Sequence, residues 1–204
     1  MNYSHLFKGR QEGFQKYGSI YQLPIIRSPY EYLRAYYREG LVLDIGAGAD
    51  LYIKTLLRLD DNTYFSLDND PSGPFSYNQI SDIPDGMEFK WIIMNQLVEH
   101  LTIDQAVIML TGLKSFFHPE GQAIITTPNI FHPNRFWGDP THLTPWGHNA
   151  LYGLLTGIGY QVPYIFRYSK NHRPIDPLTW VVERIMRRLY RIDWCDSIMV
   201  IATR

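Results

Sequence analysis

The ten-residue segment LVLDIGAGAD, from Leu41 to Asp50, constrains the fold of this chain more than any other stretch. Apolar residues on both sides of Asp44 predict a buried parallel strand, and Gly46 and Gly48 predict a tight turn directly after it. Asp50 is a suitable N-cap for a leucine-rich helix. A strand, a glycine turn and a helix in this order form the first unit of a nucleotide-binding α/β sheet, in which ligands lie outside the carboxyl ends of the strands.

The spacing of the glycines separates two classes of nucleotide. A dinucleotide fingerprint requires a third glycine three positions after the second, because the helix must pack closely and present its N-terminus to a pyrophosphate. That position is Leu51 in this chain, which argues against a nicotinamide-dependent oxidoreductase. Asp44, an acid at the strand end, instead suits a ligand that carries an amino-acid ammonium group.

Length and charge set limits on the remaining possibilities. A chain of 204 residues that is 45% hydrophobic predicts one globular domain, or one domain with an appended arm. The 19 Lys and Arg residues nearly balance the 20 Asp and Glu residues, so we expect no nucleic-acid partner. A single cysteine, no apolar run typical of a secretory signal and no stretch of ~20 apolar residues together predict a cytoplasmic protein without a transmembrane segment.

The pattern of apolar residues predicts an α/β fold. Candidate strands are Leu41–Ile45, Thr63–Leu67, Tyr77–Ile80, Phe89–Met94, Gln122–Thr127, Tyr160–Tyr168 and Ser197–Thr203. Candidate helices are Tyr30–Arg38, Leu51–Leu59, Thr102–Phe117, Trp146–Gly157 and Leu178–Ile192, and the polar stretch Lys170–Pro177 predicts a turn. Residues 1–40 are expected to form an N-terminal arm or cap outside the sheet, and residues 41–204 the main domain.

Four short motifs follow one another along the chain. The Asp44-x-Gly-x-Gly turn is followed by Asp68 after the second strand, by Glu99-His100-Leu101 after the fourth and by Thr127-Pro128-Asn129 after the fifth. Their order and spacing resemble the class I S-adenosylmethionine-dependent methyltransferases of small molecules. The resemblance implies a Rossmann-like sandwich with a seven-strand, mostly parallel sheet whose last strand is antiparallel, and S-adenosylmethionine as the cofactor. Asp50 departs from the pattern, because the family often has a glycine there.

The resemblance also implies which residues bind the cofactor. It assigns the methionine-side turn, the ribose site and the adenosine flank to Asp44, Gly46, Ala47, Gly48, Asp68, Asn69, Asp82, Ile83, Asn95 and Gln96. A carboxylate after the second strand, such as Asp68, can hold a ribose diol. The alternative for Asp68 is a turn before Pro71, and the alternative for Asp82 is a surface turn.

A histidine-rich loop, Ile130–His148, leaves the carboxyl end of the fifth strand, so the topology places it over the ligand pocket. His142 is the candidate general base, because a neutral imidazole can accept the proton of an acceptor hydroxyl, and Asp139 is the candidate residue that orients it. In one alternative interpretation, methyl transfer needs only alignment of the reactants and no general base. In the other, His142 binds backbone groups of its own loop.

Two further patterns bear on ligands. The set His132, Asp139, His142 and His148 matches no dense metal-ligand motif, so we expect no metal site, and His100 is expected to be structural. The helix over Leu178–Ile192 has a basic face made of Arg184, Arg187, Arg188 and Arg191. This face predicts peripheral contact with an anionic membrane or a phosphorylated substrate, or is simply solvated.

The sequence therefore predicts methyl transfer from S-adenosylmethionine to an oxygen or nitrogen nucleophile of a small molecule. The run Asp139 to Pro145, DPTHLTP, resembles a segment of bacterial methyltransferases linked to cell-surface sugar and lipid-quinone pathways. A sugar, cell-surface glycan or quinone acceptor is the narrower hypothesis. The alternatives are a non-catalytic module that uses the cofactor fold to dock a partner or membrane, and a nicotinamide-dependent oxidoreductase.

Overall fold

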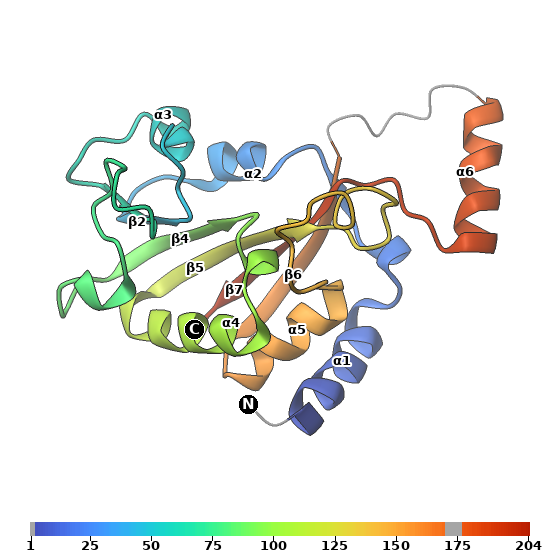
Figure 1. The fold of residues 1–204 in the computed structure, drawn as a ribbon, viewed down its shortest axis with the longest axis horizontal. Coiled ribbons are helices and arrows are strands. Elements are labelled where there is room, and N and C mark those ends of the chain that lie inside the picture. Colours follow the sequence, from blue (N-terminus) through green and yellow to red (C-terminus); the bar gives the residue numbers. More distant parts are fainter. Residues whose placement is uncertain (1–2, 170–176) are drawn as a thin grey trace.

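The computed structural model describes residues 3–169 and 177–204 (Figure 1). Its strands are β1 (Ile25–Ile26), β2 (Val42–Ile45), β3 (Tyr64–Leu67), β4 (Phe89–Asn95), β5 (Phe117–Pro128), β6 (Gln161–Tyr168) and β7 (Ser197–Thr203). Its α-helices are α1 (Tyr3–Tyr17), α2 (Pro29–Tyr36), α3 (Tyr52–Leu57), α4 (Ile103–Leu113), α5 (His148–Gly157) and α6 (Pro177–Tyr190). Short 3₁₀ turns are η1 (Ile20–Gln22), η2 (Ile80–Asp82), η3 (Val98–His100) and η4 (Lys114–Phe116).

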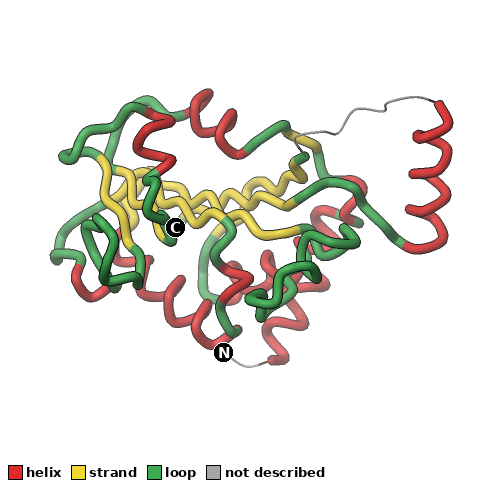
Figure 2. Tube along the Cα trace, turned by 45° about the horizontal axis from the view of Figure 1, so that its top comes forward, coloured by secondary structure: helices red, strands yellow, loops and turns green. Residues whose placement is uncertain are grey.

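The strands form one seven-stranded sheet in the order β1-β6-β7-β5-β4-β2-β3. β7 runs antiparallel to both of its neighbours, and the other pairings are parallel. Helices α2 and α3 cover one face, whereas α1, α4 and α5 lie on the other (Figures 1 and 2). The expected mostly parallel sheet with an antiparallel last strand is confirmed.

The central strands are buried on both faces, as their unbroken apolar sequences predict. All four residues of β2 are buried, including Asp44. The core therefore has two parts. One contains Leu43, Met94 and the α4 and α5 residues beneath the sheet, and the other contains Val42 and the residues of α2 and α3 above it. Parallel sheets are stable only when both faces are covered in this way.

Two predictions about the edges of the sheet are wrong: the strand over Tyr77–Ile80, and the position of residues 1–40 entirely outside the sheet. Tyr77 makes only an isolated bridge to Leu67, and Ile80 begins η2, because polar, exposed residues surround this segment. The seventh strand is β1, which belongs to the predicted N-terminal arm. It pairs parallel with β6, and Arg167 N donates to the carbonyl of Pro24 at 2.9 Å. Part of the arm is thus part of the sheet.

The rest of the arm packs against α5 and over the top of the sheet. Helix α1 lies beside α5 (Figure 1), and two glycines bring their backbones together. A Cβ atom added at Gly9 would lie 2.5 Å from the Cα of Gly153, so no larger residue fits at this contact. The ring of Tyr17 packs edge-on against Tyr152 with centroids 5.7 Å apart. Helix α2 then crosses the opposite face of the sheet.

The predicted N-cap is correct for α4 and wrong for α3. Thr102 caps α4 by accepting a hydrogen bond from Gln105 N, as expected. Asp50 is not the N-cap of α3, and this prediction is wrong. The cap is Leu51, which has a left-handed φ of 44° and makes no side-chain cap bond. The glycine loop turns once more before the helix starts, which moves Asp50 out of the capping position.

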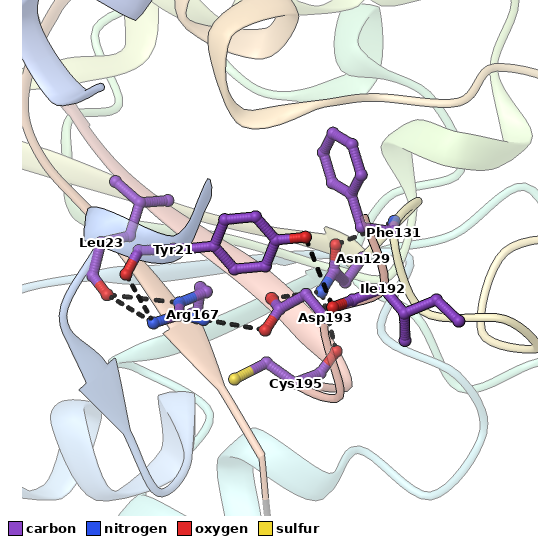
Figure 3. Close-up of polar contacts among 8 residues, drawn as sticks. All are labelled: Tyr21, Leu23, Asn129, Phe131, Arg167, Ile192, Asp193 and Cys195. Carbon is purple, nitrogen blue, oxygen red and sulfur yellow. Dashed lines mark hydrogen bonds and ion pairs between the residues drawn. The ribbon is translucent and has the colours of Figure 1, made fainter. Parts of the chain in front are cut away.

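A buried ion pair joins the arm, β6 and the segment before β7 (Figure 3). Arg167 Nη1 donates to Asp193 Oδ1 at 2.8 Å, and the guanidinium also donates to the carbonyls of Tyr21 and Leu23. Asp193 Oδ2 accepts from Asn129 Nδ2 at 2.8 Å. We refer to Arg167, Asp193 and Asn129 as the anchor network. It fixes the place where the histidine-rich loop leaves β5.

Helix α6 projects away from the sheet in both views (Figures 1 and 2). The predicted turn over Lys170–Pro177 lies outside the described residues, apart from Pro177, which begins α6. None of the helices in the described ranges has the length and apolar character needed to span a bilayer.

Candidate functional site

Two cavities open near the carboxyl ends of β2, β4 and β5. The first, which we call the glycine-loop cavity, has a volume of about 560 Å³ and is lined by α2, the turn after β2, α3 and the end of β4. The second, the histidine cavity, has a volume of about 510 Å³ and is lined by η3, the histidine-rich loop and the ends of β5 to β7. Both volumes lie in the usual range for small-molecule sites.

Asp44 lies at the base of the glycine-loop cavity. Its side chain is almost fully buried, and Tyr64 Oη donates a hydrogen bond to Asp44 Oδ2 at 2.7 Å. Burial raises the pKa of Asp44 to about 6, and the hydrogen bond from Tyr64 opposes this rise. Tyr64 was not predicted as a site residue, because only the pairing of β2 with β3 brings the two side chains together.

The glycine turn has the backbone conformation that its sequence predicts. Gly46 and Gly48 have left-handed φ values of 70° and 64°. A Cβ atom at Gly46 would also lie 3.1 Å from a methyl carbon of Leu97, so both shape and conformation favour glycine there. Gly48 N donates to Asp68 Oδ2 at 3.2 Å. The predicted ribose-binding acid is therefore held beside the turn.

Asp68 is also part of a local turn. Its Oδ1 accepts from Asp70 N at 3.2 Å, which is the turn arrangement that the sequence left as the alternative. The side chain remains half-buried, and the neighbouring Asn69 is exposed. The carboxylate thus accepts one hydrogen bond within its own turn and one from the glycine loop, and ribose binding by Asp68 stays a prediction.

Asp82 and Ile83 lie apart from both cavities. Asp82 accepts hydrogen bonds from Asn78 N, Gln79 N and Gln79 Nε2, so both of its oxygens are used within the η2 turn. Ile83 is buried in the core beneath the sheet. This is the geometry of the surface turn that the sequence left as an alternative for Asp82.

A chain of hydrogen bonds connects the two cavities. Asn95 Nδ2 donates to Tyr30 Oη at 3.1 Å, and Thr126 Oγ1 donates to Asn95 Oδ1 at 2.8 Å. Gln96 donates to Thr126 Oγ1 from both its backbone N and its Nε2, each at 3.0 Å. Tyr30 and Asn95 line the glycine-loop cavity, and Gln96 lines the histidine cavity. The predicted residues at the end of β4 therefore face both cavities.

Gln96 has an unusual backbone. Its φ is 54°, in the left-handed region that a non-glycine residue rarely occupies. The two bonds to Thr126 hold it there. Local strain of this kind is concentrated at functional sites, where neighbouring contacts stabilise a conformation that the residue alone would avoid.

Glu99 is a buried acid in the wall of the histidine cavity. Its side chain is 0% exposed, and neither carboxylate oxygen has a hydrogen-bond partner within the described part of the chain. Burial raises the pKa of Glu99 to about 7. The sequence drew attention to the Glu99-His100-Leu101 motif but not to this missing partner, which depends on the packing around η3.

His142 faces the same cavity. Its Nδ1 lies 2.8 Å from the carbonyl oxygen of Phe136. Because a carbonyl can only accept, Nδ1 carries the proton and Nε2 presents a lone pair. Nε2 lies 3.7 Å from Asp139 Oδ2, too far for a hydrogen bond, and Asp139 Oδ1 accepts from Thr141. The predicted pair is close in space, but the backbone of Phe136 orients the imidazole.

His100 lies beside His142. The two ring centroids are 4.9 Å apart, and His100 Nδ1 is 3.2 Å from the carbonyl oxygen of Thr141. The other histidines considered from the sequence lie elsewhere. His148 Nε2 bonds the carbonyl of Gly18 at 3.0 Å, and the ring of His132 packs edge-on against Trp194. Among the predicted set, only Asp139 and His142 are brought together.

Neither a family model nor a curated protein matches this sequence, but solved structures match its fold. A SAM-dependent methyltransferase from Archaeoglobus fulgidus matches with a TM-score of 0.64 and 21% identity over 100% of both chains. One from Mesorhizobium loti matches with a TM-score of 0.56 and 14% identity, over 85% of this chain and 96% of that one. One from Methanosarcina mazei matches with a TM-score of 0.56 and 12% identity, over 87% and 98%.

This chain has the class I S-adenosylmethionine-dependent methyltransferase fold. Within that methyltransferase fold, both cavities lie where parallel α/β sheets bind their ligands, outside the carboxyl ends of the strands. Tyr30 is a site residue that the sequence did not indicate. No local pattern distinguishes it from the other tyrosines of the arm, because its role depends on α2 crossing the glycine loop.

Proposed function

We propose that this protein binds S-adenosylmethionine in the glycine-loop cavity and transfers its methyl group to an acceptor in the histidine cavity. The observation that carries the proposal is the chain of hydrogen bonds from Tyr30 through Asn95 and Thr126 to Gln96, which places two ligand-sized cavities side by side. A methyl transfer needs a donor and an acceptor in neighbouring sites, held in line.

The charges of the glycine-loop cavity suit the cofactor. Asp44 and Asp50 both line it, so two carboxylates face the space that the amino-acid ammonium and the sulfonium would occupy. We propose that the turn Gly46–Gly48 cradles the methionine part and that Asp68, fixed by Gly48 N, holds the ribose hydroxyls. Asn69 and Asn95 complete the proposed set on the adenosine side, and Gln96 marks the boundary with the acceptor. Asp82 and Ile83, which line neither cavity, are not part of this proposed set.

In the reaction, a lone pair of the acceptor oxygen or nitrogen attacks the methyl carbon while the carbon–sulfur bond breaks. S-adenosylhomocysteine leaves, and the acceptor loses a proton. His142 lines the histidine cavity, and its Nε2, the nitrogen that does not bond Phe136, can take that proton. Asp139 Oδ2, 3.7 Å away, would stabilise the resulting imidazolium.

We propose a small acceptor that carries hydroxyl or amine groups. The histidine cavity has a small-molecule volume, and its wall presents Gln96, Glu99, His100, Asp139 and Arg135. Polar groups of this kind bind hydroxyls rather than apolar rings. A sugar or glycan acceptor therefore fits the cavity better than the quinone that the sequence left open.

Titration calorimetry with S-adenosylhomocysteine tests the cofactor site. We expect one site per chain for the unmodified protein and at least about tenfold weaker binding by Asp68→Ala, which corresponds to about 1.4 kcal/mol. Asp70→Ala is the matched control, because Asp70 is an exposed acid in the same turn and accepts its bonds from Ser72. No binding by the unmodified protein, or equal binding by Asp68→Ala, would contradict the proposal.

Helix α6 supports a second proposal, peripheral contact with an anionic membrane. Its apolar residues are exposed, with Leu178 at 72% and Leu189 at 66%. The guanidinium of Arg184 lies over Trp180, and that of Arg187 lies 3.8 Å from the ring centroid of Tyr21. A helix with exposed apolar and cationic residues suits a bilayer interface.

Cosedimentation with vesicles tests this contact. We expect the protein to bind vesicles that contain phosphatidylserine and to remain unbound with phosphatidylcholine alone. Arg188→Glu, which reverses a charge on α6, should abolish binding without changing the affinity for S-adenosylhomocysteine. Equal binding to both kinds of vesicle would contradict the electrostatic contact.

If the protein binds the cofactor but turns over no acceptor of any class, the non-catalytic alternative is favoured.

A further inference from the structure

We propose that Glu99, His100 and His142 form a binding site for a divalent transition-metal ion in the wall of the histidine cavity. One ligand atom from each residue lies within 4.8 Å of the other two. Two imidazole nitrogens and one carboxylate oxygen are a common donor set for such an ion. Two metal–ligand bonds of about 2.1 Å span at most ~4.2 Å, so a bound ion would draw the three side chains slightly inward.

Both imidazoles are already oriented as metal ligands. His142 Nδ1 lies 2.8 Å from the Phe136 carbonyl oxygen, and His100 Nδ1 lies 3.2 Å from the Thr141 carbonyl oxygen. Each contact assigns the ring proton to Nδ1 and leaves the lone pair on Nε2. A backbone carbonyl on the second nitrogen is the usual partner of a metal-binding histidine, because it fixes both tautomer and ring direction.

Glu99 supplies the second, independent observation. Its carboxylate is fully buried, and neither of its oxygens has a hydrogen-bond partner among the residues described. A buried carboxylate is costly unless it is paired, protonated or bound to a metal. Because neither oxygen of Glu99 makes a hydrogen bond within the described residues, a bound cation would supply the interaction that the carboxylate lacks.

The backbone holds the three ligands together. The carbonyl of Glu99 accepts hydrogen bonds from Leu143 N at 2.7 Å and Thr144 N at 3.0 Å. Thr144 Oγ1 also donates to the carbonyl of Leu101 at 2.5 Å. These bonds fasten the histidine-rich loop to η3 directly beside His142. The ligands therefore come from two segments that are distant in the sequence, and only His142 among them belongs to the loop set that the sequence offered for a metal.

The donor set selects the kind of ion. Imidazole nitrogen suits Zn²⁺, Fe²⁺, Ni²⁺ and Cu²⁺, whereas Ca²⁺ and Mg²⁺ prefer sites made of oxygen ligands. Three protein ligands leave coordination positions open, as in catalytic rather than structural metal sites. All three residues line the cavity that Gln96 and Asp139 also line, so an ion held there would be open to a ligand in that cavity.

The site deepens the proposed function, and this part of the inference rests on it. An acceptor hydroxyl bound at an open position would have its pKa lowered by the ion and would be held for attack on the methyl carbon. His142 would then be a metal ligand, and the acceptor proton would go to solvent or to Asp139. The binding of the ion itself does not depend on methyl transfer.

Titration of the metal-free protein with Co²⁺ tests the site, because the ligand field of bound Co²⁺ gives a visible absorption spectrum. We expect one Co²⁺ per chain, displaced by Zn²⁺ but not by Mg²⁺. Glu99→Gln and His142→Ala should bind at least about 100-fold more weakly, since even the loss of an outer-shell partner costs about 10- to 100-fold. His132→Ala, a histidine of the same loop outside the site, should bind like the unmodified protein.

Two results would overturn the inference: no stoichiometric Co²⁺ binding by the unmodified protein, or equal binding by Glu99→Gln. Circular dichroism during thermal unfolding checks that each variant is folded. Glu99→Gln keeps the shape of the side chain and removes a buried charge, so it should fold in any case. Calorimetry with S-adenosylhomocysteine on the same samples separates failure of the metal site from failure of the proposed cofactor site.

Discussion

Two buried carboxylates near the carboxyl end of β5 differ in their partners. Asp193, in the anchor network, is 5% exposed and bonds Arg167 at 2.8 Å and Asn129 at 2.8 Å. Glu99, in the histidine cavity, is 0% exposed and has no hydrogen-bond partner among the described residues. Both acids lie beside the histidine-rich loop, but only one has its charge compensated by this chain.

The difference indicates what each site does. A buried ion pair with every donor and acceptor satisfied fixes a junction of the fold. A buried acid without a partner lowers stability, and it persists where a ligand supplies the missing interaction. Asp44 lies between the two cases, because it has a single partner, Tyr64, and also lines a cavity.

Breaking the anchor network should have the largest effect on stability. Arg167→Met leaves Asp193 buried without its cation, and we expect the free energy of unfolding to fall by about 3 to 5 kcal/mol in urea denaturation. The double variant Arg167→Met, Asp193→Leu should regain part of this loss, because the uncompensated charge is gone. A loss below about 1 kcal/mol in the single variant would show that the pair does not hold the junction.

Burial of Asp44 should make the free energy of unfolding depend on pH, by about 3 kcal/mol at most. Its pKa is raised from 3.8 to about 6 in the folded state, so the folded protein binds more protons than the unfolded chain between these values. The free energy of unfolding should therefore fall as the pH rises from about 4 to 6. In Asp44→Asn the part of this fall that Asp44 causes should be absent, as urea denaturation at several pH values can show. The part due to Glu99, whose pKa burial raises from 4.5 to about 7, should remain. An identical pH profile in both proteins would be inconsistent with the burial of Asp44.

Replacing Glu99 should not lower the free energy of unfolding, in contrast to replacing Arg167. Removing its charge in Glu99→Gln leaves no partner uncompensated, so the metal-free variant should be as stable as the unmodified protein or up to about 1 kcal/mol more stable. Thermal unfolding in the presence of a chelator measures this. A loss of more than about 1 kcal/mol would mean that Glu99 has structural partners like those of Asp193.

Asp50→Gly should have the smallest effect on stability. Because Leu51 caps α3, the loss of the Asp50 side chain should change the free energy of unfolding by less than about 0.5 kcal/mol. The same variant should bind S-adenosylhomocysteine several-fold more weakly if its carboxylate faces the ammonium group. Unchanged affinity would remove Asp50 from the cofactor site.

The sequence predicted the parts of the fold whose causes are local. The apolar run of β2, the glycines at 46 and 48 and the Thr102 cap all act within a few residues, and the structure has each of them. β1 could not be predicted, because a two-residue strand has no pattern of its own and depends on β6. The seven-strand count was right although one predicted strand was wrong.

The site was predictable to a similar degree. Asp44 and Asn95 line the glycine-loop cavity, and Asp68 bonds the glycine turn beside it, because strand ends meet at one edge of a parallel sheet. Tyr30, Tyr64 and the grouping of Glu99 with His142 depend on tertiary packing between distant segments. Only the folded chain shows that Glu99 lacks a partner.

A crystal structure of the protein grown with S-adenosylhomocysteine tests the account most directly. We expect the adenosine and homocysteine parts to lie along the turn Gly46–Gly48, with the ribose hydroxyls on Asp68 and the sulfur directed past Gln96 toward the histidine cavity. A cofactor bound elsewhere, or a sulfur directed away from His142 and Glu99, would contradict the assignment of the two cavities to donor and acceptor.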